Sequence, residues 1–183
     1  SLDVSKAFDK LNHFALLLKL MDRLLPVNII TLLLNWYCKS FAMVNWFGSI
    51  SCKYSLRAGV RQGGVLSPIL FSVYTDSVIA ALQCQGLGCH IGFLCLSILM
   101  YADDLVLVAS SVTEIQKMIN VCVDVLEKLD LNINVKKSTC IKIGKGFNSF
   151  CSDLIVCNSA VPWSSSMLYL GITIKSSVDF KID

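Results

Sequence analysis

Two adjacent aspartates, Asp103 and Asp104, interrupt an otherwise apolar segment that reads SILMYADDLVLVA over residues 97–109. A charge moved from water into an apolar interior without a partner costs on the order of several kcal/mol, even after relaxation. The segment is therefore exposed at this point, or positive charge lies beside it. A turn aspartate that bonds to nearby backbone explains one of the two residues well, but it explains the pair poorly. The pair thus raises the possibility of a cation site.

A third carboxylate, Asp3, lies in a strand-like segment at the start of the chain, and Asp9 follows six residues later. Divalent cations such as Mg²⁺ prefer hard oxygen ligands and keep several water or phosphate oxygens. One hundred residues separate Asp3 from Asp103, so only the tertiary fold can bring them together. The spacing by itself leaves this question open.

The elements that must position these carboxylates follow from apolar periodicity and turn residues. Helices are expected over residues 8–24, 27–38, 68–83 and 113–129, with Thr113 as the cap of the last. A short strand is expected at the start of SLDVSKAF, residues 1–8. Further strands or hairpins are expected over residues 41–59, 98–101, 105–109, 131–143 and 153–175. Loops are expected over residues 60–68 and 85–93. Hairpins dominate over strand–helix–strand alternation, which favours an α+β fold in which helices pack on one face of an antiparallel sheet. In this fold the tip of the 98–109 hairpin carries the Asp103–Asp104 pair.

The composition limits the class of protein. The chain has 183 residues, of which 55% are hydrophobic and 16% charged, so it fits one domain, or one and a part, with a sizeable core. The most apolar stretches, 65–81 and 91–102, lack the ~20 uninterrupted apolar residues of a membrane-spanning helix. A net charge of +3 is compatible with nucleic acid without requiring it.

Nine cysteines are scattered along the chain without a CxxC pair, which favours reduced thiols and no zinc site. The first residues, SLDVSKAFDK, have neither the pattern of a signal peptide nor an initiator methionine. We therefore expect a piece of a longer protein that is located inside the cell, in the cytoplasm and nucleus.

Five motifs, LDVSKAFD, GVRQGGVLSPILF, YADD, LNINVKKS and YLGITI, follow one another between Leu2 and Ile174. Their types and order resemble the palm of reverse transcriptases, first those of non-LTR (LINE-type) retrotransposons and next those of group II introns. YADD alone is weak evidence, but five motifs in order are specific. The resemblance implies a truncated palm over residues 1–143 without its fingers. It also implies the end of the palm, with primer-grip-like strands and no thumb, over residues 144–183.

The resemblance also implies a metal site. Three aspartates would hold two Mg²⁺ ions, with Mn²⁺ as an alternative, in which Asp3 and Asp103 are the principal ligands and Asp104 is a weaker or indirect one. One ion would activate the primer 3′-hydroxyl, and the other would orient the triphosphate and steady the leaving pyrophosphate. The backbone amide of Val4 is expected beside the triphosphate.

Other residues gain roles from the same resemblance. Phe8 would block a ribose 2′-hydroxyl, although it could also be a core residue at the start of a helix. Arg61, Gln62, Gly63 and Gly64 form a loop that would position the incoming nucleotide and the templating base, because glycines permit close backbone approach. A solvated arginine is the alternative for Arg61.

Lysine and primer contacts complete the implied site. Lys137 would protonate or neutralise the departing pyrophosphate, with Lys136 as a rival and a solvated surface pair as the alternative. Tyr101, Leu170 and Gly171 would contact the primer.

The implied function is RNA-directed DNA synthesis on an RNA template, a DNA primer and dNTPs, with no membrane and no small-molecule cofactor. Without fingers and thumb, the segment alone is expected to be inactive or nearly so. One alternative is a non-catalytic palm-derived RNA-binding module or decayed copy, which the intact aspartates disfavour. A nuclease or phosphohydrolase is disfavoured because His13 and His90 lie away from any acidic cluster.

Overall fold

A computed structural model describes residues 1–92 and 94–182. Its mixture of helices and antiparallel strands confirms the predicted α+β class. The chain divides into two compact units, residues 1–5 with 76–183 and residues 6–75, and each is treated by itself. The predicted boundary at residue 143 stays a prediction. Residue 93, the last of the predicted 85–93 loop, lies outside the described residues. So does residue 183, the last of the predicted 144–183 segment.

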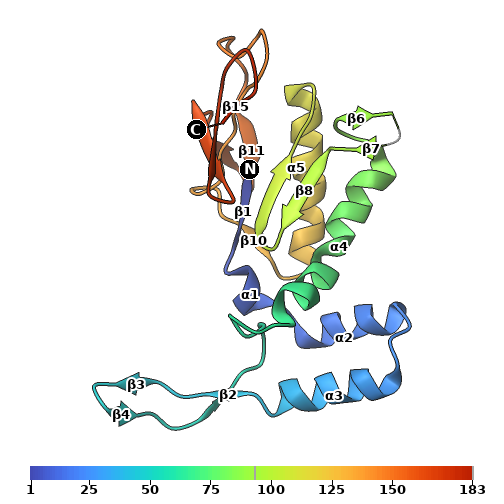
Figure 1. The fold of residues 1–183 in the computed structure, drawn as a ribbon, viewed down its shortest axis with the longest axis vertical. Coiled ribbons are helices and arrows are strands. Elements are labelled where there is room, and N and C mark those ends of the chain that lie inside the picture. The colour runs from blue at the N-terminus through green and yellow to red at the C-terminus, as the bar shows by residue number, and fades with distance from the viewer. Residues whose placement is uncertain (93, 183) are drawn as a thin grey trace. The chain divides into compact units, whose positions relative to one another are not determined.

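A four-stranded antiparallel sheet lies at the centre of the first unit (Figure 1). Its strands, in spatial order, are β10 (Asn132–Ile133), β1 (Leu2–Ser5), β9 (Asp104–Leu107) and β8 (Ile98–Tyr101). Side chains alternate between the two faces of a strand, so Leu2 and Val4 enter the core while Asp3 points to the opposite face. The first carboxylate is thus carried on a strand that has neighbours on both sides.

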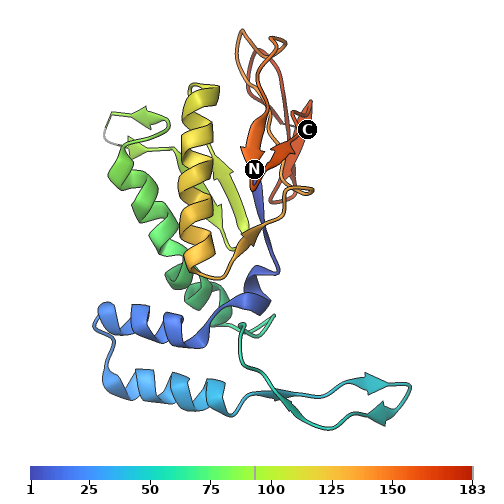
Figure 2. The same ribbon diagram turned by 180° about the vertical axis from the view of Figure 1, so that it is seen from behind.

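Helix α5 (Val112–Lys128) and the later part of α4 (Ser67–Gln85) cover one face of this sheet (Figures 1 and 2). Met118, Cys122 and Leu126 recur at helical spacing on the buried side of α5. Burial raises the pKa of the Cys122 thiol to about 12, so it stays protonated at neutral pH.

The predicted cap of α5 is wrong by two residues. Ser111 has an extended backbone, and its Oγ accepts a hydrogen bond from the Glu114 amide at 3.2 Å. Thr113 already lies inside the helix. An N-cap residue must have a non-helical backbone, and only Ser111 satisfies this condition here.

Short strands complete the first unit. They are β6 (His90–Ile91), β7 (Leu94–Cys95), β11 (Leu154–Val156), β12 (Ser159–Val161), β13 (Ser166–Tyr169), β14 (Ile172–Lys175) and β15 (Lys181–Ile182). The β6–β7 hairpin forms where a loop was predicted, and β10 is shorter than the strand predicted over 131–143. β13, β14 and β15 make a separate antiparallel sheet.

The second unit contains the helices and hairpins of residues 6–75. They are α1 (Ala7–Lys10), α2 (His13–Asp22), α3 (Val27–Cys38), the start of α4, β2 (Phe41–Ala42), β3 (Asn45–Trp46), β4 (Ser49–Ile50) and β5 (Tyr54–Ser55). The helix predicted over 27–38 and the hairpin over 41–59 are confirmed. The single helix predicted over 8–24 is wrong, because Asn12 starts a new helix by accepting bonds from the amides of Phe14 and Ala15. In the described part of the chain, no helix is long and apolar enough to cross a membrane.

Two glycines near the end of α4 allow a matched test of packing. Both have positive φ, +60° at Gly86 and +89° at Gly88. A Cβ at Gly88 would lie 2.5 Å or less from the side chain of Ser97, whereas a Cβ at Gly86 would meet nothing within 4 Å. We expect Gly88→Ala to lower the free energy of unfolding by about 2 kcal/mol more than Gly86→Ala, because only Gly88→Ala adds an overlap. Urea unfolding of both variants measures the difference, and equal losses would contradict the packing.

Candidate active site

The central sheet brings together the carboxylates that the sequence separates. Asp3 on β1 lies directly opposite Asp104 on β9, and Asp104 lies opposite Tyr101 on β8. Residues directly opposite in an antiparallel pair have Cβ atoms roughly 4.5–5.5 Å apart and share one face of the sheet. The strand register therefore places two carboxylates side by side on the face opposite the buried Leu2 and Val4.

The hairpin turn consists of Ala102 and Asp103, so Asp104 is the first residue of β9 and not part of the turn as predicted. Ala102 has a φ of 53°, a left-handed conformation that costs a residue with a Cβ about 1 kcal/mol. The Val4 amide donates a hydrogen bond of 3.3 Å to the Asp103 carbonyl. The structure thus gives this amide a partner in the turn, whereas the sequence predicted that it faces a triphosphate.

The negative charges of Asp3 and Asp103 act on Asp104. The pKa of Asp104 is raised, first by partial burial, then by the charge of Asp103, and then by that of Asp3. The pKa of the Tyr169 phenol at the end of β13 is raised by burial and by the negative charge of Asp104. The β13–β14 hairpin is therefore close enough to sense the carboxylates.

The donor chemistry of this cluster fits a hard divalent cation. All three side chains are carboxylates, which supply the hard oxygen ligands that Mg²⁺ prefers. Within residues 1–92 and 94–182, however, no three acidic, histidine or cysteine side chains are already arranged as a group that could hold a metal ion. The residues fit an ion in their donor chemistry, and the strand register sets two of them side by side.

Ser138 fixes Asp3 and was missed as a site residue by the sequence analysis. The Asp3 amide donates to Ser138 Oγ at 3.1 Å, and Ser138 Oγ donates to the Asn134 carbonyl at 2.9 Å. The Asn134 amide in turn donates to the Asp3 carbonyl at 2.7 Å. The only sequence signal was the position of this buried serine inside LNINVKKS.

The remaining predicted residues of the first unit lie on its surface. Lys136 and Lys137 are exposed on the turn after β10, and Tyr101 is 65% exposed at the end of β8. Leu170 and Gly171 form the turn between β13 and β14, both with positive φ. Next to them, Tyr169 was missed as a residue near Asp104, although it lies inside the quoted YLGITI motif.

In the second unit, Phe8 is half-buried and stacks on Phe71 with ring centroids 4.8 Å apart. Val60 donates a backbone hydrogen bond of 2.7 Å to the Phe8 carbonyl. A Cβ on the preceding Gly59 would lie 2.9 Å from the same carbonyl, so only glycine fits there. The glycine loop is thereby fixed to the segment that carries Phe8, and the sequence analysis did not single out Gly59.

The predicted loop residues lie beside a pocket of the second unit. Arg61, Gln62 and Gly64 line this pocket of about 1000 Å³ together with Trp36. Gly63 has a φ of +75°, and the Arg61 carbonyl accepts a 2.6 Å hydrogen bond from Ser67 Oγ. The loop conformation therefore depends on glycine and on a hydroxyl at the start of α4.

Residues 1–174 match the family model described as reverse transcriptase (RNA-dependent DNA polymerase). The chain belongs to the reverse transcriptase family. It is similar to the retrovirus-related Pol polyprotein from the type-2 retrotransposable element R2DM of Drosophila melanogaster. The two are 32% identical over 144 residues, which cover 79% of this chain and 13% of that protein.

Two further relatives extend the comparison. The retrovirus-related Pol polyprotein of an R2 element of Popillia japonica is 29% identical over 145 residues, or 78% of this chain and 20% of its own. The RNA-directed DNA polymerase from the mobile element jockey of Drosophila funebris is 25% identical over 186 residues, or 98% of this chain and 20% of its own. This reverse transcriptase chain spans a fifth or less of the length of these relatives.

These relatives confirm the LINE-type prediction, and the chain is a reverse transcriptase segment of a retrotransposon. Reverse transcriptases generally use divalent metal ions, which agrees with the carboxylate donors of the sheet. The roles predicted for individual residues remain predictions.

Neutralising one aspartate tests the repulsion inside the cluster. A raised pKa means that the folded state binds the Asp104 proton more tightly than the unfolded state does, so this group adds stability as the pH falls and withdraws it as the pH rises. We expect Asp104→Asn, measured by urea unfolding at pH 7 in EDTA, to stabilise the fold by about 0.5 kcal/mol.

Asp124→Asn is the control, because it makes the same charge change on the exposed side of α5. In the same measurement at pH 7 in EDTA, its stability should stay close to that of the wild type. Mg²⁺ should raise the melting temperature of the wild type and of Asp124→Asn, and raise that of Asp104→Asn much less. A destabilised Asp104→Asn in EDTA would show that the three carboxylates do not repel one another.

Proposed function

We propose that this chain is the catalytic palm of an RNA-directed DNA polymerase that transfers nucleotides from dNTPs to a primer 3′-hydroxyl on an RNA template. The observation that carries this proposal is the register that sets Asp3 opposite Asp104, beside the turn that carries Asp103. In-line displacement at phosphorus develops negative charge on oxygen atoms, and cations held by carboxylates stabilise that charge.

The three aspartates would hold two Mg²⁺ ions, with Asp3 and Asp103 as principal ligands. Bound ions would favour deprotonation of the primer hydroxyl and stabilise the leaving pyrophosphate. Asp104 would serve as a weaker or indirect ligand, because the side chains of adjacent residues such as Asp103 and Asp104 diverge. Val4 would act through its hydrogen bond to the Asp103 carbonyl, which holds the turn against β1.

Other residues would bind the substrates. Phe8, held by its stack on Phe71, would exclude a ribose 2′-hydroxyl, and the Arg61–Gly64 loop would position the nucleotide and the templating base. Lys137 would neutralise pyrophosphate from the exposed turn after β10. Tyr101, Leu170 and Gly171 would contact the primer, because Tyr101 faces Asp104 across the sheet and the β13–β14 turn follows Tyr169.

Primer extension tests the polymerase proposal. In the longer protein that contains this chain, Asp103→Asn should lower dNTP incorporation at least ~100-fold, because one metal ligand is lost. Asp124→Asn should leave incorporation unchanged. Residues 1–183 alone should extend a primer poorly. Wild-type activity in Asp103→Asn would overturn the proposal, and release of nucleotides from the nucleic acid would favour a nuclease.

Sugar selection tests the role of Phe8 separately. Phe8→Val removes the bulk next to the sugar, so we expect the ratio of ribonucleotide to deoxynucleotide incorporation to rise at least ~10-fold, as specificity set by one steric contact allows. Phe14→Val, at a position of α2 that is 71% exposed, is the matched control. An unchanged ratio in Phe8→Val would leave Phe8 a core residue that only packs on Phe71.

A further inference from the structure

A long stretch of the second unit carries positive charge only. Between Asp22 and Asp76 the sequence has no Asp or Glu, although the chain contains 13 acidic residues. The same stretch has five basic residues: Arg23, Lys39, Lys53, Arg57 and Arg61. Its charge of +5 exceeds the +3 of the whole chain, so the basic excess of the protein is concentrated here. Such a bias is the electrostatic footprint of a polyanion-binding surface.

Within this stretch, the paired strands β2–β5 and β3–β4 form an arm that extends beyond α3 (Figure 1). Every residue from 43 to 58 is exposed, so neither face of the arm covers a core. An isolated two-stranded hairpin is only marginally stable in water. The arm nevertheless carries large apolar side chains that do not pack within the unit. Exposed apolar side chains of this kind mark a surface that binds another molecule.

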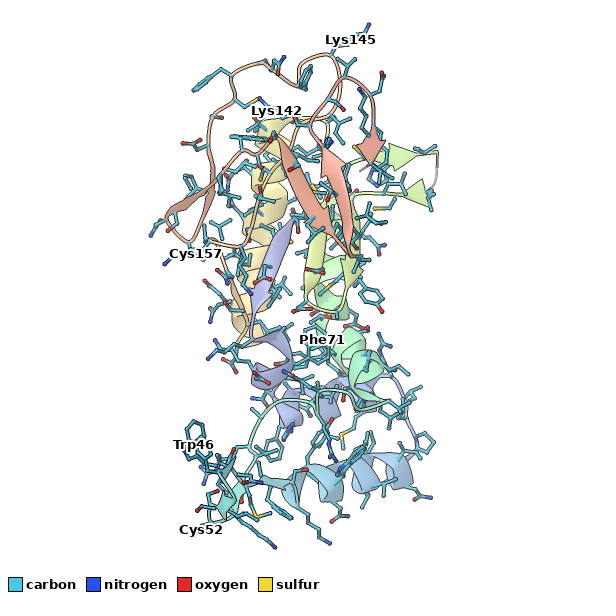
Figure 3. All side chains as sticks on the ribbon, turned by 60° about the vertical axis from the view of Figure 1, so that its left-hand side comes forward. Trp46, Cys52, Phe71, Lys142, Lys145 and Cys157 are labelled. Atoms are coloured by element: carbon cyan, nitrogen blue, oxygen red, sulfur yellow. The ribbon has the colours of Figure 1, made fainter. Side chains whose placement is uncertain are left out.

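The tip of the arm presents two aromatic rings. Trp46, labelled in Figure 3 near Cys52, is 71% exposed, and Phe47 is 95% exposed. Their rings meet edge to face with centroids 5.3 Å apart. Phe47 and the following Gly48 both have positive φ, 47° and 84°, so the turn is tight. Exposed aromatic faces on a basic surface are the platforms on which unpaired bases stack.

Basic side chains and a groove continue from the base of the arm. Lys53 Nζ lies 4.5 Å from the centroid of the Phe41 ring. Phe41 and Ala42 line the same pocket as Lys39 and Arg61. Asp9 also lines this pocket, so the acid-free surface begins at the arm itself. A nucleic-acid strand that leaves the pocket along the arm would meet no acidic side chain of the segment 23–75.

We propose that the arm of residues 41–55, together with Arg57 just after it, binds single-stranded nucleic acid. Trp46 and Phe47 stack on unpaired bases, and Lys53 and Arg57 neutralise phosphates. The identity of the bound strand rests on the proposed function: in a polymerase that copies RNA, the single strand is the unpaired RNA template. A lipid bilayer fits less well, because the open edges of a two-stranded hairpin would leave backbone groups unpaired in hydrocarbon. A second copy of the chain would bring two segments of +5 together.

The test is binding of a fluorescent, unstructured 20-nucleotide RNA to residues 1–183, measured by anisotropy in EDTA and without dNTPs. Trp46→Ala/Phe47→Ala should weaken binding at least tenfold. Phe150→Ala removes a 98% exposed aromatic side chain of the first unit and should change nothing. Lys53→Ala/Arg57→Ala should weaken binding and flatten its dependence on salt, because two phosphate contacts are lost.

Tryptophan emission gives a second readout that does not depend on a truncated side chain. RNA should quench the emission of the wild type, and the quenching should be largely lost in Trp46→Phe, which keeps a stacking ring and most of the affinity. A single-stranded DNA of the same sequence should also bind, since stacking is indifferent to the sugar, whereas a blunt duplex should bind more weakly.

Four results would overturn the proposal. They are equal affinity of the tip variant and the wild type, equal quenching by RNA in the wild type and Trp46→Phe, preference for duplex, and tip-dependent partition into anionic vesicles in place of RNA binding. The two proposals fail separately. Tip-dependent RNA binding without primer extension in the longer protein would overturn the polymerase, and extension with tip-independent binding would overturn the arm.

Discussion

The mutual repulsion of three carboxylates is the constraint on which the first unit depends. Asp3 and Asp104 are direct cross-strand neighbours, and Asp103 lies in the adjoining turn. Like charges in these positions destabilise a sheet, so the backbone must hold the carboxylates together against their electrostatic repulsion. It does so by placing β1 in the interior of the sheet, with β9 on one side and β10 on the other.

The hydrogen bonds around Asp3 show how this position is maintained. Its amide and carbonyl are bonded to Ser138 and Asn134, while the following residue, Val4, donates to the Asp103 carbonyl. Buried Leu2 and Val4 fix the opposite face of the strand in the core. These backbone hydrogen bonds and the buried neighbours therefore hold the carboxylate in its place. A site of this kind is less stable without a cation than with one, which is a common relation between stability and function at catalytic centres.

The second unit depends on close backbone packing at one place and on exposed side chains at another. Gly59 approaches the backbone of Phe8 and Asp9 too closely for any side chain, so the loop that follows is fixed to the N-terminal segment. The arm beyond it has no core of its own and carries only positive charge. One part of this unit is closely packed around Gly59, and the other presents exposed aromatic and basic side chains. The two parts meet at the pocket that contains Arg61 and Phe41.

The sequence alone determined the class of fold, the helix over 27–38, the hairpins around Gly48 and the aspartates, and the family. These features depend on local periodicity, turn residues and motif order, all of which can be read from neighbouring residues. Sequence reasoning failed where a single cap decided the outcome. Asn12 divides a continuous apolar pattern into two helices, and Ser111 competes with Thr113 at nearly equal propensity.

Only the tertiary structure decided which carboxylates meet. Apolar spacing predicted that Asp3 and Asp104 lie in or near strands, but strand order and register are long-range properties that no local pattern encodes. A shift of one residue in the pairing of β1 with β9 would turn Asp3 to the core face and separate the two charges. Ser138 and Tyr169 became visible for the same reason, because their importance lies in a contact with a residue more than sixty positions away.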